Sequence, residues 1–267
     1  MPSMGTIAIT GSASGMGAAT RYLLTAAGHR VIGIDLRDAD VIADLATPAG
    51  RAGAVEGVRA AAGEDGLDGA VTFAGVMGLP GRDGSLVASI NYFGTVEVLT
   101  GLRPLLAANH QTAAVCISSN STTVQPAIPL DLVEACSAGD EALARQLADK
   151  AGAMATYPAT KMAIARWVRR QATTPDWIGA GITLNAVAPG YVTTPMTEEG
   201  MQNPAMAKML DQFPVPVGRP GRPEEIAAFV AFLLSEDARF FCGSVLFCDG
   251  GSDALFRTDD WPSVWEI

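Results

Sequence analysis

A tyrosine and a lysine four residues apart are the side chains best suited to proton transfer in this sequence. Tyr157 and Lys161 lie in the run Tyr-Pro-Ala-Thr-Lys. Residues four apart on a helix share a face, so both can reach one site, and Pro158 suits the first position of such a helix. A phenol with a pKa of about 10 is a poor base near neutral pH, and a neighbouring ammonium favours its phenolate form. In a chain with only three lysines, the pair favours acid–base chemistry over a buried tyrosine beside a surface lysine.

A glycine-rich turn near the start of the sequence predicts a binding site for a pyrophosphate. The run Thr10-Gly-Ser-Ala-Ser-Gly-Met-Gly17 follows a strand pattern and opens a helical one. Glycines allow a tight turn, and backbone N–H groups at a helix N-terminus favour an anion. Because this is the first strand–helix turn of an alternating chain, dinucleotide binding is favoured over an ordinary turn.

Asp35 ends the second expected strand, about 20 residues beyond the glycine loop, where an acid can accept hydrogen bonds from a ribose. Its charge would repel the additional phosphate of NADP, so NAD is the expected cofactor. A solvated aspartate at a strand end is the alternative, and the nearby Arg37 could weaken the preference for NAD.

Serines gather where the fifth expected strand ends. Ser118, Ser119 and Ser121 follow an apolar run. Ligand-binding groups collect at the carboxyl ends of strands in open sheets. Any of the three hydroxyls could hold the oxygen atom of a substrate, or all three could form turns.

Short apolar runs typical of buried strands alternate with helical patterns along the chain. The expected strands are 6–10, 30–35, 40–44, 69–74, 113–118, 182–187 and 244–248, and the expected helices are 18–27, 52–62, 94–106, 158–172 and 224–235. This alternation predicts an α/β fold: a single-domain, doubly wound parallel sheet of the Rossmann type with about seven strands.

Two stretches interrupt the alternation. Residues 120–156 predict a helical insertion after the fifth strand, with two short helices, the second beginning after Asp140. Residues 191–217 hold several prolines and four methionines, which predicts a loop-rich excursion with an apolar face. The tail 257–267 carries Trp261 and Trp265, whose role the sequence does not define.

The composition narrows the classes of partner. Nearly half of the 267 residues are hydrophobic, which is enough for a core, and the net charge of −10 argues against a nucleic-acid partner. Two histidines make a histidine metal site improbable, and the four cysteines lack metal-site or disulfide spacing. The sequence contains neither a basic leader nor an apolar run of transmembrane length. A cytoplasmic protein without a membrane partner is expected.

These motifs together resemble the short-chain dehydrogenase/reductase family over about residues 5–256. The loop has the spacing Gly-x-x-x-Gly-x-Gly, Ser119 precedes the Tyr157-x-x-x-Lys161 pair, and Asn185-Ala-Val-Ala-Pro-Gly190 follows it. Before Ala74-Gly75, the sequence has Thr72 and Phe73 where the family usually has asparagines. The resemblance implies hydride transfer between NAD and a secondary alcohol or its ketone.

The resemblance also implies roles for individual residues. Tyr157 would be the general acid/base, Ser119 would polarise the carbonyl, Lys161 would anchor the ribose and tune Tyr157, and Asn91 would support a proton relay unless it is only a packing residue. Asp44 would contact adenine, although a turn aspartate is also compatible. The implied cofactor-binding residues are Gly11, Ser14, Gly15, Met16, Gly17, Asp35, Leu36, Asp44, Leu45, Ala74, Gly75, Tyr157, Lys161, Pro189, Gly190, Val192 and Thr194.

Within the family, the runs 32–45 and 89–94 and the long insertion are most similar to the bacterial 3α-hydroxysteroid dehydrogenase and carbonyl reductase group. A bulky apolar secondary alcohol or ketone is therefore the expected substrate, and a homodimer or homotetramer the expected assembly. An aryl or allylic alcohol dehydrogenase of the coniferyl alcohol type is the alternative enzyme, and a non-catalytic NAD-binding scaffold is the alternative class. The expected apolar cover of the site comes from Met196, Met201, Met206, Met209 and Phe213, with Val76, Met77, Leu79 and Pro80.

Overall fold

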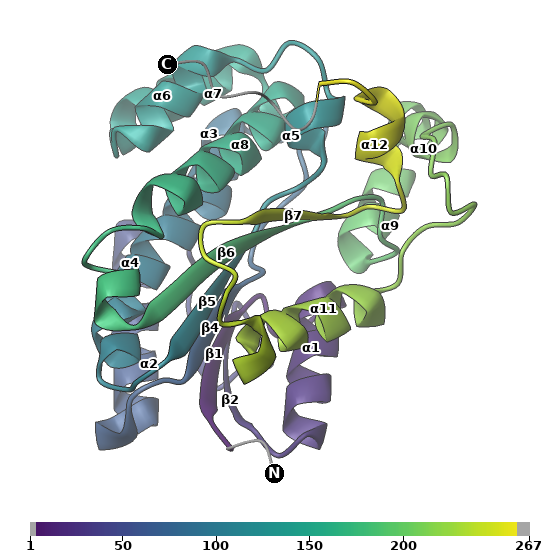
Figure 1. Cartoon of the computed structure of the whole chain (residues 1–267). Helices are drawn as coiled ribbons and strands as arrows, with labels where there is room; N and C mark the ends of the chain where they lie inside the picture. Colours follow the sequence, from purple (N-terminus) through teal and green to yellow (C-terminus); the bar gives the residue numbers. More distant parts are fainter. Residues whose placement is uncertain (1–3, 261–267) are drawn as a thin grey trace, which may run out of the picture.

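Seven parallel strands form the sheet that positions the site (Figure 1). The computed structural model describes residues 4–260, and the strand order is β3-β2-β1-β4-β5-β6-β7. The strands are β1 (Thr6–Thr10), β2 (Arg30–Asp35), β3 (Val41–Ile42), β4 (Gly69–Thr72), β5 (Thr112–Ile117), β6 (Ile182–Pro189) and β7 (Val245–Cys248). The predicted doubly wound fold in one domain is confirmed.

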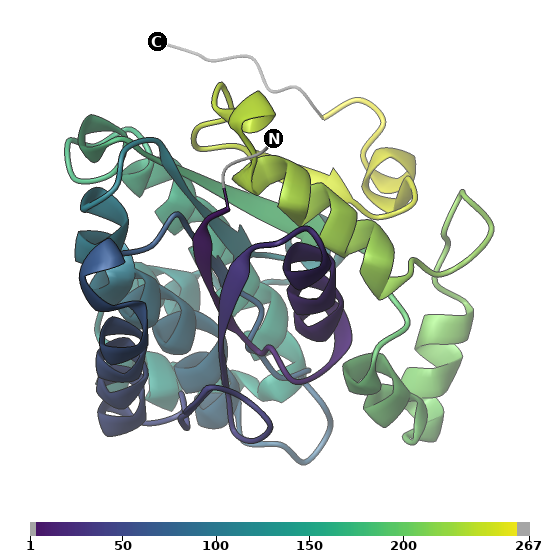
Figure 2. The same ribbon diagram turned by 90° about the horizontal axis from the view of Figure 1, so that it is seen from below.

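Helices cover both faces of the sheet (Figures 1 and 2). One face packs against α1 (Gly15–Ala26) and α11 (Pro223–Leu234), and the other against α2 (Pro48–Ala62), α4 (Gly94–Ala107) and α8 (Ala153–Gln171). Neighbouring strand residues face opposite layers, as with Ala8 in one hydrophobic cluster and Ile9 in the other. Short 3₁₀ turns at Gly63–Asp65, Ile178–Ala180 and Glu236–Ala238 complete the connections.

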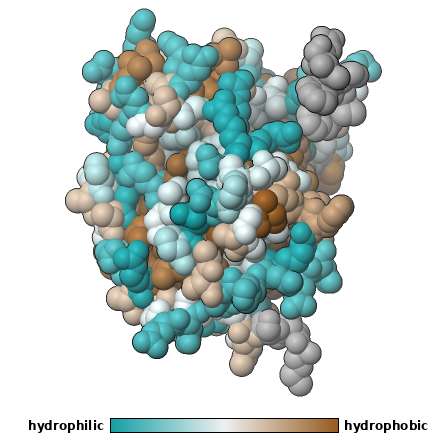
Figure 3. Space-filling model, turned by 60° about the vertical axis from the view of Figure 1, so that its left-hand side comes forward, coloured by the Kyte–Doolittle hydropathy of each residue, from teal (hydrophilic) through white to brown (hydrophobic). Residues whose placement is uncertain are grey.

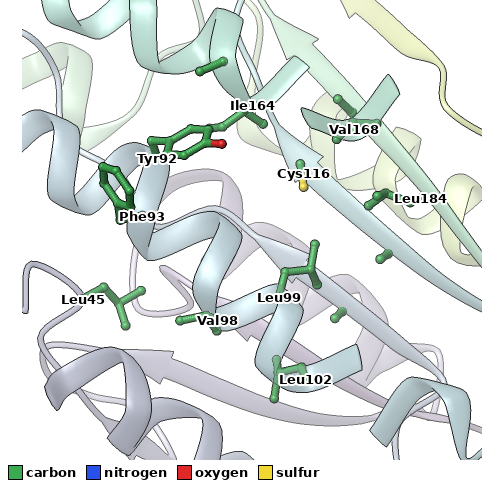
Figure 4. Packing of buried hydrophobic residues seen from close by; sticks show 14 of the residues in the cluster. Leu45, Tyr92, Phe93, Val98, Leu99, Leu102, Cys116, Ile164, Val168 and Leu184 are labelled. Atoms are coloured by element: carbon green, nitrogen blue, oxygen red, sulfur yellow. The ribbon is translucent and has the colours of Figure 1, made fainter. Parts of the chain in front are cut away.

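The larger hydrophobic cluster joins α4 and α8 on one face of the sheet. In Figure 4, Leu99 of α4, Ile164 and Val168 of α8, and Cys116 of β5 come together. Cys116 is fully buried, and burial raises the pKa of its thiol to about 12. Cys116 is therefore a core residue.

The strand order reverses between β1 and β4. From β1 the chain continues to β2 on one side, whereas β4 continues to β5 on the other. A crevice opens at such a point beyond the carboxyl ends of the strands, where open α/β sheets bind ligands. Hydrogen bonds join the end of β1 to the segment that follows β4. Phe73 N donates to Thr10 O at 3.1 Å, and Ala74 N donates to Thr10 Oγ1 at 3.1 Å.

The start of α8 differs from the prediction. The helix begins at Ala153, so Pro158 lies inside it, and its expected place at the first helical position is wrong. Proline has no N–H to donate to the carbonyl of Met154. Gln125 supplies a donor instead, because its Nε2 lies 3.3 Å from Met154 O. A hydrogen bond from the insertion thus replaces the one that Pro158 cannot make, although local preference places proline at a helix start.

The insertion 120–156 is part of the main core. It forms α5 (Ser121–Val124), α6 (Leu130–Ser137) and α7 (Glu141–Ala151), one short helix more than predicted. The predicted start of α7 is confirmed, because the Asp140 side chain accepts a hydrogen bond from Leu143 N at 3.0 Å. Leu132 and Cys136 of α6 and Ala144 of α7 are fully buried in the cluster that also contains α8.

The excursion 191–217, named the flap below, contains two short helices, α9 (Pro195–Met201) and α10 (Pro204–Asp211). After β7 the chain forms a last short helix, α12 (Ser252–Phe256). Figure 1 shows α12 between α5 of the insertion and α10 of the flap. Trp261 and Trp265 lie outside the described residues.

On the face shown in Figure 3, hydrophobic residues are scattered among hydrophilic ones, so they do not merge into one large apolar patch. No helix within residues 4–260 is long and apolar enough to cross a membrane.

A buried arginine ties the insertion to the rest of the fold. Arg51 of α2 is 2% exposed and its Nε lies 2.7 Å from Glu97 Oε2 on α4. Its Nη2 pairs with the carboxylate of Glu141 at the start of α7, and Ser89 Oγ donates to the same carboxylate at 2.8 Å. An arginine removed from water in this way needs its partners.

We expect Glu141→Ala to lower the free energy of unfolding by about 3 kcal/mol, because it leaves the buried Arg51 with only one carboxylate. Urea denaturation of the two proteins measures the difference. Glu56→Ala is the control, since Glu56 pairs with Arg59 on the exposed side of α2, and its effect should stay within about 0.5 kcal/mol. Equal losses in the free energy of unfolding would show that the buried ion pair stabilises the fold no more than the exposed one.

Candidate active site

The tyrosine and the serine predicted to act on a substrate face each other beyond the end of β5. Ser119 follows β5 and is 8% exposed, whereas Tyr157 lies on α8. The Ser119 hydroxyl lies within hydrogen-bonding reach of the Tyr157 hydroxyl. Lys161, one turn further along α8, has its Nζ 5.8 Å from the centre of the tyrosine ring. The structure brings all three predicted side chains together.

The three serines near the end of β5 differ in their hydrogen bonds. Ser118 Oγ donates to the backbone oxygen of Lys161 at 2.9 Å, so this hydroxyl fastens β5 to α8. Ser119 Oγ accepts a hydrogen bond from Ser121 N at 3.1 Å and lines the same cavity as Tyr157. Ser121 Oγ is buried and finds no partner within the described part of the chain. All three serines line the cavity, but Ser119 is the one whose hydroxyl lowers the pKa of Tyr157.

Lys161 is held at the strand end by a backbone carbonyl. Its Nζ donates to Ile117 O at 2.9 Å, and the residue is 5% exposed. Burial lowers the pKa of this ammonium from its ordinary value of 10.5 to about 8. The group therefore carries its charge at neutral pH despite its surroundings.

The expected lowering of the tyrosine pKa is not found in the chain alone. Burial raises the pKa of Tyr157 above its ordinary value, and the hydrogen bond from Ser119 opposes that rise only in part. The ammonium of Lys161 lies over the ring face and donates to Ile117 O, so it does not contact the phenol oxygen. Desolvation is thus the dominant effect on the pKa of this phenol.

Asn91 fastens the loop after β4 beside the lysine. It lies in a π-helical turn, Ser89–Phe93, that follows the short helix α3 (Gly84–Ala88), and it is fully buried. Val76 N donates to its Oδ1 at 2.8 Å, and its Nδ2 donates to Val76 O at 3.0 Å. A Cβ on Gly75 would lie 3.2 Å from Asn91 Oδ1 and 3.8 Å from Lys161 Nζ. Asn91 and Lys161 therefore converge on Gly75.

A cleft of about 180 Å³ lies at the switch point of the sheet. Most predicted cofactor residues line it: Gly11, Ser14, Gly15, Met16, Gly17, Asp35, Leu36, Asp44, Leu45, Ala74, Gly75 and Thr194. The prediction missed others that line it, namely Ile34, Ala43, Phe73, Val76, Ile90, Pro195 and Met196. The missed residues are mainly apolar and have no sequence pattern that separates them from core residues.

The glycine loop leaves backbone donors open to this cleft. Gly11 has a φ of 70°, and a Cβ on Gly17 would lie 2.1 Å from Gly11 O, so the first turn of α1 can approach the loop only with glycine at that position. Ser14 caps α1 without a side-chain hydrogen bond, and its first turn has no acidic residue. An anion such as a pyrophosphate fits these free N–H groups and the helix dipole.

Two aspartates mark the other end of the cleft. Asp35 Oδ2 accepts from Ala13 N at 3.0 Å and its Oδ1 accepts from Leu36 N at 2.7 Å, so the carboxylate is held beside the glycine loop. Asp44 both lines the cleft and accepts from Ala46 N at 3.0 Å before α2. The two interpretations of Asp44, as a cleft residue and as a turn residue, are therefore compatible.

A second cavity, of about 510 Å³, contains Ser119, Tyr157 and Lys161. It shares four residues with the cleft, so the two spaces adjoin: Met16, Phe73, Thr194 and Met196. The predicted cofactor residues Pro189, Gly190 and Val192 line this cavity rather than the cleft.

The predicted apolar cover of the site is confirmed in part. Met77, Met196, Met206, Met209 and Phe213 line the second cavity, whereas Val76 lines the cleft and Met201, Leu79 and Pro80 line neither space. The prediction missed a wall formed by the insertion and the last helix: Val124, Gln125, Pro126, Met154 and Phe256. Their place depends on how these segments pack, which the sequence pattern does not define.

Two basic residues near the cavity, Arg82 and Lys208, do not line it. Arg82 Nη2 pairs with Glu199 Oε1 of α9 at 2.7 Å, and its Nη1 donates to Met77 O at 2.6 Å. Within residues 4–260 no cluster of His, Cys, Asp and Glu is arranged to hold a metal ion.

Comparisons with known proteins agree with this geometry. A family described as enoyl-(acyl carrier protein) reductase matches residues 150–253. The chain is 41% identical to the 3-alpha-hydroxysteroid dehydrogenase/carbonyl reductase of Comamonas testosteroni, over 95% of this chain and 98% of that protein. It is 30% identical to a cyclohexanol dehydrogenase of an Acinetobacter species, over 91% of this chain and 92% of the relative.

A solved structure has the same fold at high similarity. The 3-alpha-hydroxysteroid dehydrogenase from Pseudomonas sp. B-0831, complexed with NADH, is 45% identical, with a TM-score of 0.91 over 96% of this chain and 100% of the other.

We expect Lys161→Met to remove a pH dependence of stability, because burial lowers the pKa of the ammonium from 10.5 to about 8 and therefore costs stability wherever the lysine is charged in the folded chain. Below pH 8 the lysine is charged in both folded and unfolded chains, so the whole cost is present. Between pH 8 and pH 10.5 the unfolded chain binds more protons, so the wild type should gain stability relative to Lys161→Met.

Denaturation at pH 7 and pH 9.5 measures this change. Lys150→Met, at an exposed position of α7, is the control and should show no comparable shift between the two pH values. The prediction would be contradicted if the stability of the wild type relative to Lys161→Met did not rise between pH 7 and pH 9.5.

Proposed function

The chain belongs to the short-chain dehydrogenase/reductase family, and on that basis we propose that it is an NAD-dependent oxidoreductase that interconverts a bulky apolar secondary alcohol and its ketone. One observation carries the proposal: Ser119, Tyr157 and Lys161 meet in an apolar cavity that adjoins a cleft with open backbone donors. A scaffold that binds NAD without turnover would not need this convergence.

The cleft residues fit NAD. The first turn of α1 would bind the pyrophosphate, and Asp35 would accept hydrogen bonds from the ribose. Asp35 and Asp44 line this end of the cleft, and their negative charge disfavours the additional phosphate of NADP even with Arg37 nearby. When bound, NAD accepts the hydride of the alcohol, and NADH returns it to the ketone.

The side chains of the cavity handle the proton. During ketone reduction, the Tyr157 hydroxyl donates its proton to the carbonyl oxygen, and Ser119 holds that oxygen by a hydrogen bond. During alcohol oxidation the phenolate of Tyr157 takes the hydroxyl proton back. Because burial raises the pKa of Tyr157, the phenolate needs the positive charge of Lys161 nearby. Asn91 would position the loop at Gly75 and support a relay of the proton from the lysine.

The cavity favours large apolar substrates. Its methionines come from several segments and can adapt to a rigid ring system. The relatives are a 3-alpha-hydroxysteroid dehydrogenase/carbonyl reductase and a cyclohexanol dehydrogenase, which act on secondary alcohols by name. We propose a 3α-hydroxysteroid or a related carbonyl compound as the substrate, and an aryl or allylic alcohol as the alternative.

We further propose a homodimer or homotetramer in the cytoplasm. The insertion 120–156 packs on α8 of its own chain, so the contacts between subunits would differ from those of members without it. The four cysteines are free, as a reducing compartment would require.

We expect Tyr157→Phe to lower kcat/KM for a secondary alcohol by about a thousandfold, because the ring remains and the proton is lost. The Kd for NADH should stay within about threefold of the wild type, as fluorescence titration would measure. Tyr191→Phe is the matched control, because Tyr191 lines the same cavity and has no role in proton transfer, so its activity should be nearly unchanged. Wild-type rates in the Tyr157→Phe protein would refute the assignment.

A further inference from the structure

The last described helix is part of the substrate cavity. Phe256, at the end of α12, lines the cavity together with residues of the flap and of the insertion. Its ring centre lies 6.1 Å from that of Phe213 in the flap, at an interplanar angle of 38°. The two rings form a continuous aromatic wall, named the aromatic wall below.

Hydrogen bonds fasten α12 to the segments on either side of it. Thr123 of α5 donates to the carboxylate of Asp253, which is 8% exposed, and Arg257 Nη1 lies 3.1 Å from the same carboxylate. On the flap side, Ser252 Oγ donates to Pro214 O at 2.8 Å. Asp253 N also donates to Asp249 Oδ2 at 2.6 Å, at the end of β7. Phe256 therefore stands on a helix that is held in place before a substrate arrives, which limits the ordering cost of binding.

Several apolar side chains that line the cavity are about half exposed to solvent. Phe256 is 52% exposed, Met209 of the flap is 50% exposed and Met154 of α8 is 44% exposed, and all three line the cavity. These side chains come from segments far apart in the sequence. A concentration of half-exposed apolar side chains around one cavity marks a ligand site, because a bound apolar molecule would remove them from water.

The charge of the lining limits the class of ligand. Among the described residues that line the cavity, Lys161 is the only one with a formal charge, and its ammonium is engaged with Ile117 O. Nothing in this lining would pair with a phosphate or carboxylate distant from the reacting carbon. The ligand portion that lies against the aromatic wall is therefore neutral and apolar.

We propose that the aromatic wall of Phe213 and Phe256 determines substrate specificity, selecting neutral fused-ring alcohols and ketones over monocyclic ones. The inference rests on the proposed function. A fused ring system can fill the reacting corner at Ser119 and Tyr157 and still contact Phe256, whereas a single ring fills only part of the 510 Å³ cavity.

The test compares the reduction of a 3-ketosteroid and of cyclohexanone by NADH in wild-type, Phe256→Ala and Phe256→Leu proteins. Phe256→Ala should lower kcat/KM for the steroid about tenfold and leave that for cyclohexanone within about twofold. Phe256→Leu should restore a large part of the steroid activity. Leu255→Ala is the matched control, because Leu255 is 53% exposed on the same helix and does not line the cavity, so it should change neither substrate.

Calorimetric titration of each protein with the 3-ketosteroid separates this inference from the proposed function. Steroid binding that weakens about tenfold only in Phe256→Ala supports the inference, even if no ketone is reduced and the proposed function fails. The inference is overturned if the wild type does not bind the steroid, if Phe256→Ala affects both ketones equally, or if Leu255→Ala has the same effect.

Discussion

A reciprocal pair of hydrogen bonds between β5 and α8 holds the reacting corner together. Lys161 Nζ donates to Ile117 O at 2.9 Å, and Ser118 Oγ donates to Lys161 O at 2.9 Å. Because Ser119 lies two residues beyond the end of β5 and Tyr157 lies one turn before the lysine, these bonds bring the serine and the tyrosine face to face. In the proposed reaction the same ammonium would supply the positive charge that favours the phenolate. One side chain thus serves both the fold and the proposed chemistry, and burial lowers its pKa to about 8.

Around this corner, the parallel sheet forms the cleft, and the segments added to the sheet form the apolar cavity. The reversal of strand order between β1 and β4 opens the cleft, and the tight glycine loop aims backbone N–H groups into it. The insertion, the flap and α12 then build the apolar cavity beside it. The sheet explains why a dinucleotide fits, and the added segments explain why a large apolar molecule is the proposed substrate.

The sequence predicted the sheet and the convergence of Ser119, Tyr157 and Lys161 well, because both depend on local patterns. Buried runs marked the strands, and Tyr157, Lys161 and the glycine loop have spacings that few other functions require. The prediction for Pro158 was wrong because Gln125, distant in sequence, supplies the donor that lets α8 begin earlier. In the chain alone the pKa of Tyr157 is raised, because its burial cannot be judged from spacing. Phe256 was missed because only tertiary packing brings α12 to the cavity.

The most direct test of the account is to follow the hydrogen on the carbinol carbon. The protein is incubated with NAD and a 3α-hydroxysteroid deuterated at that carbon, and the NADH formed is analysed by mass spectrometry. The account predicts one deuterium in each reduced nicotinamide, because hydride passes directly from the alcohol carbon to the cofactor while Tyr157 takes only the hydroxyl proton. Reduced cofactor without deuterium, or no reduction of NAD with any secondary alcohol, would contradict it.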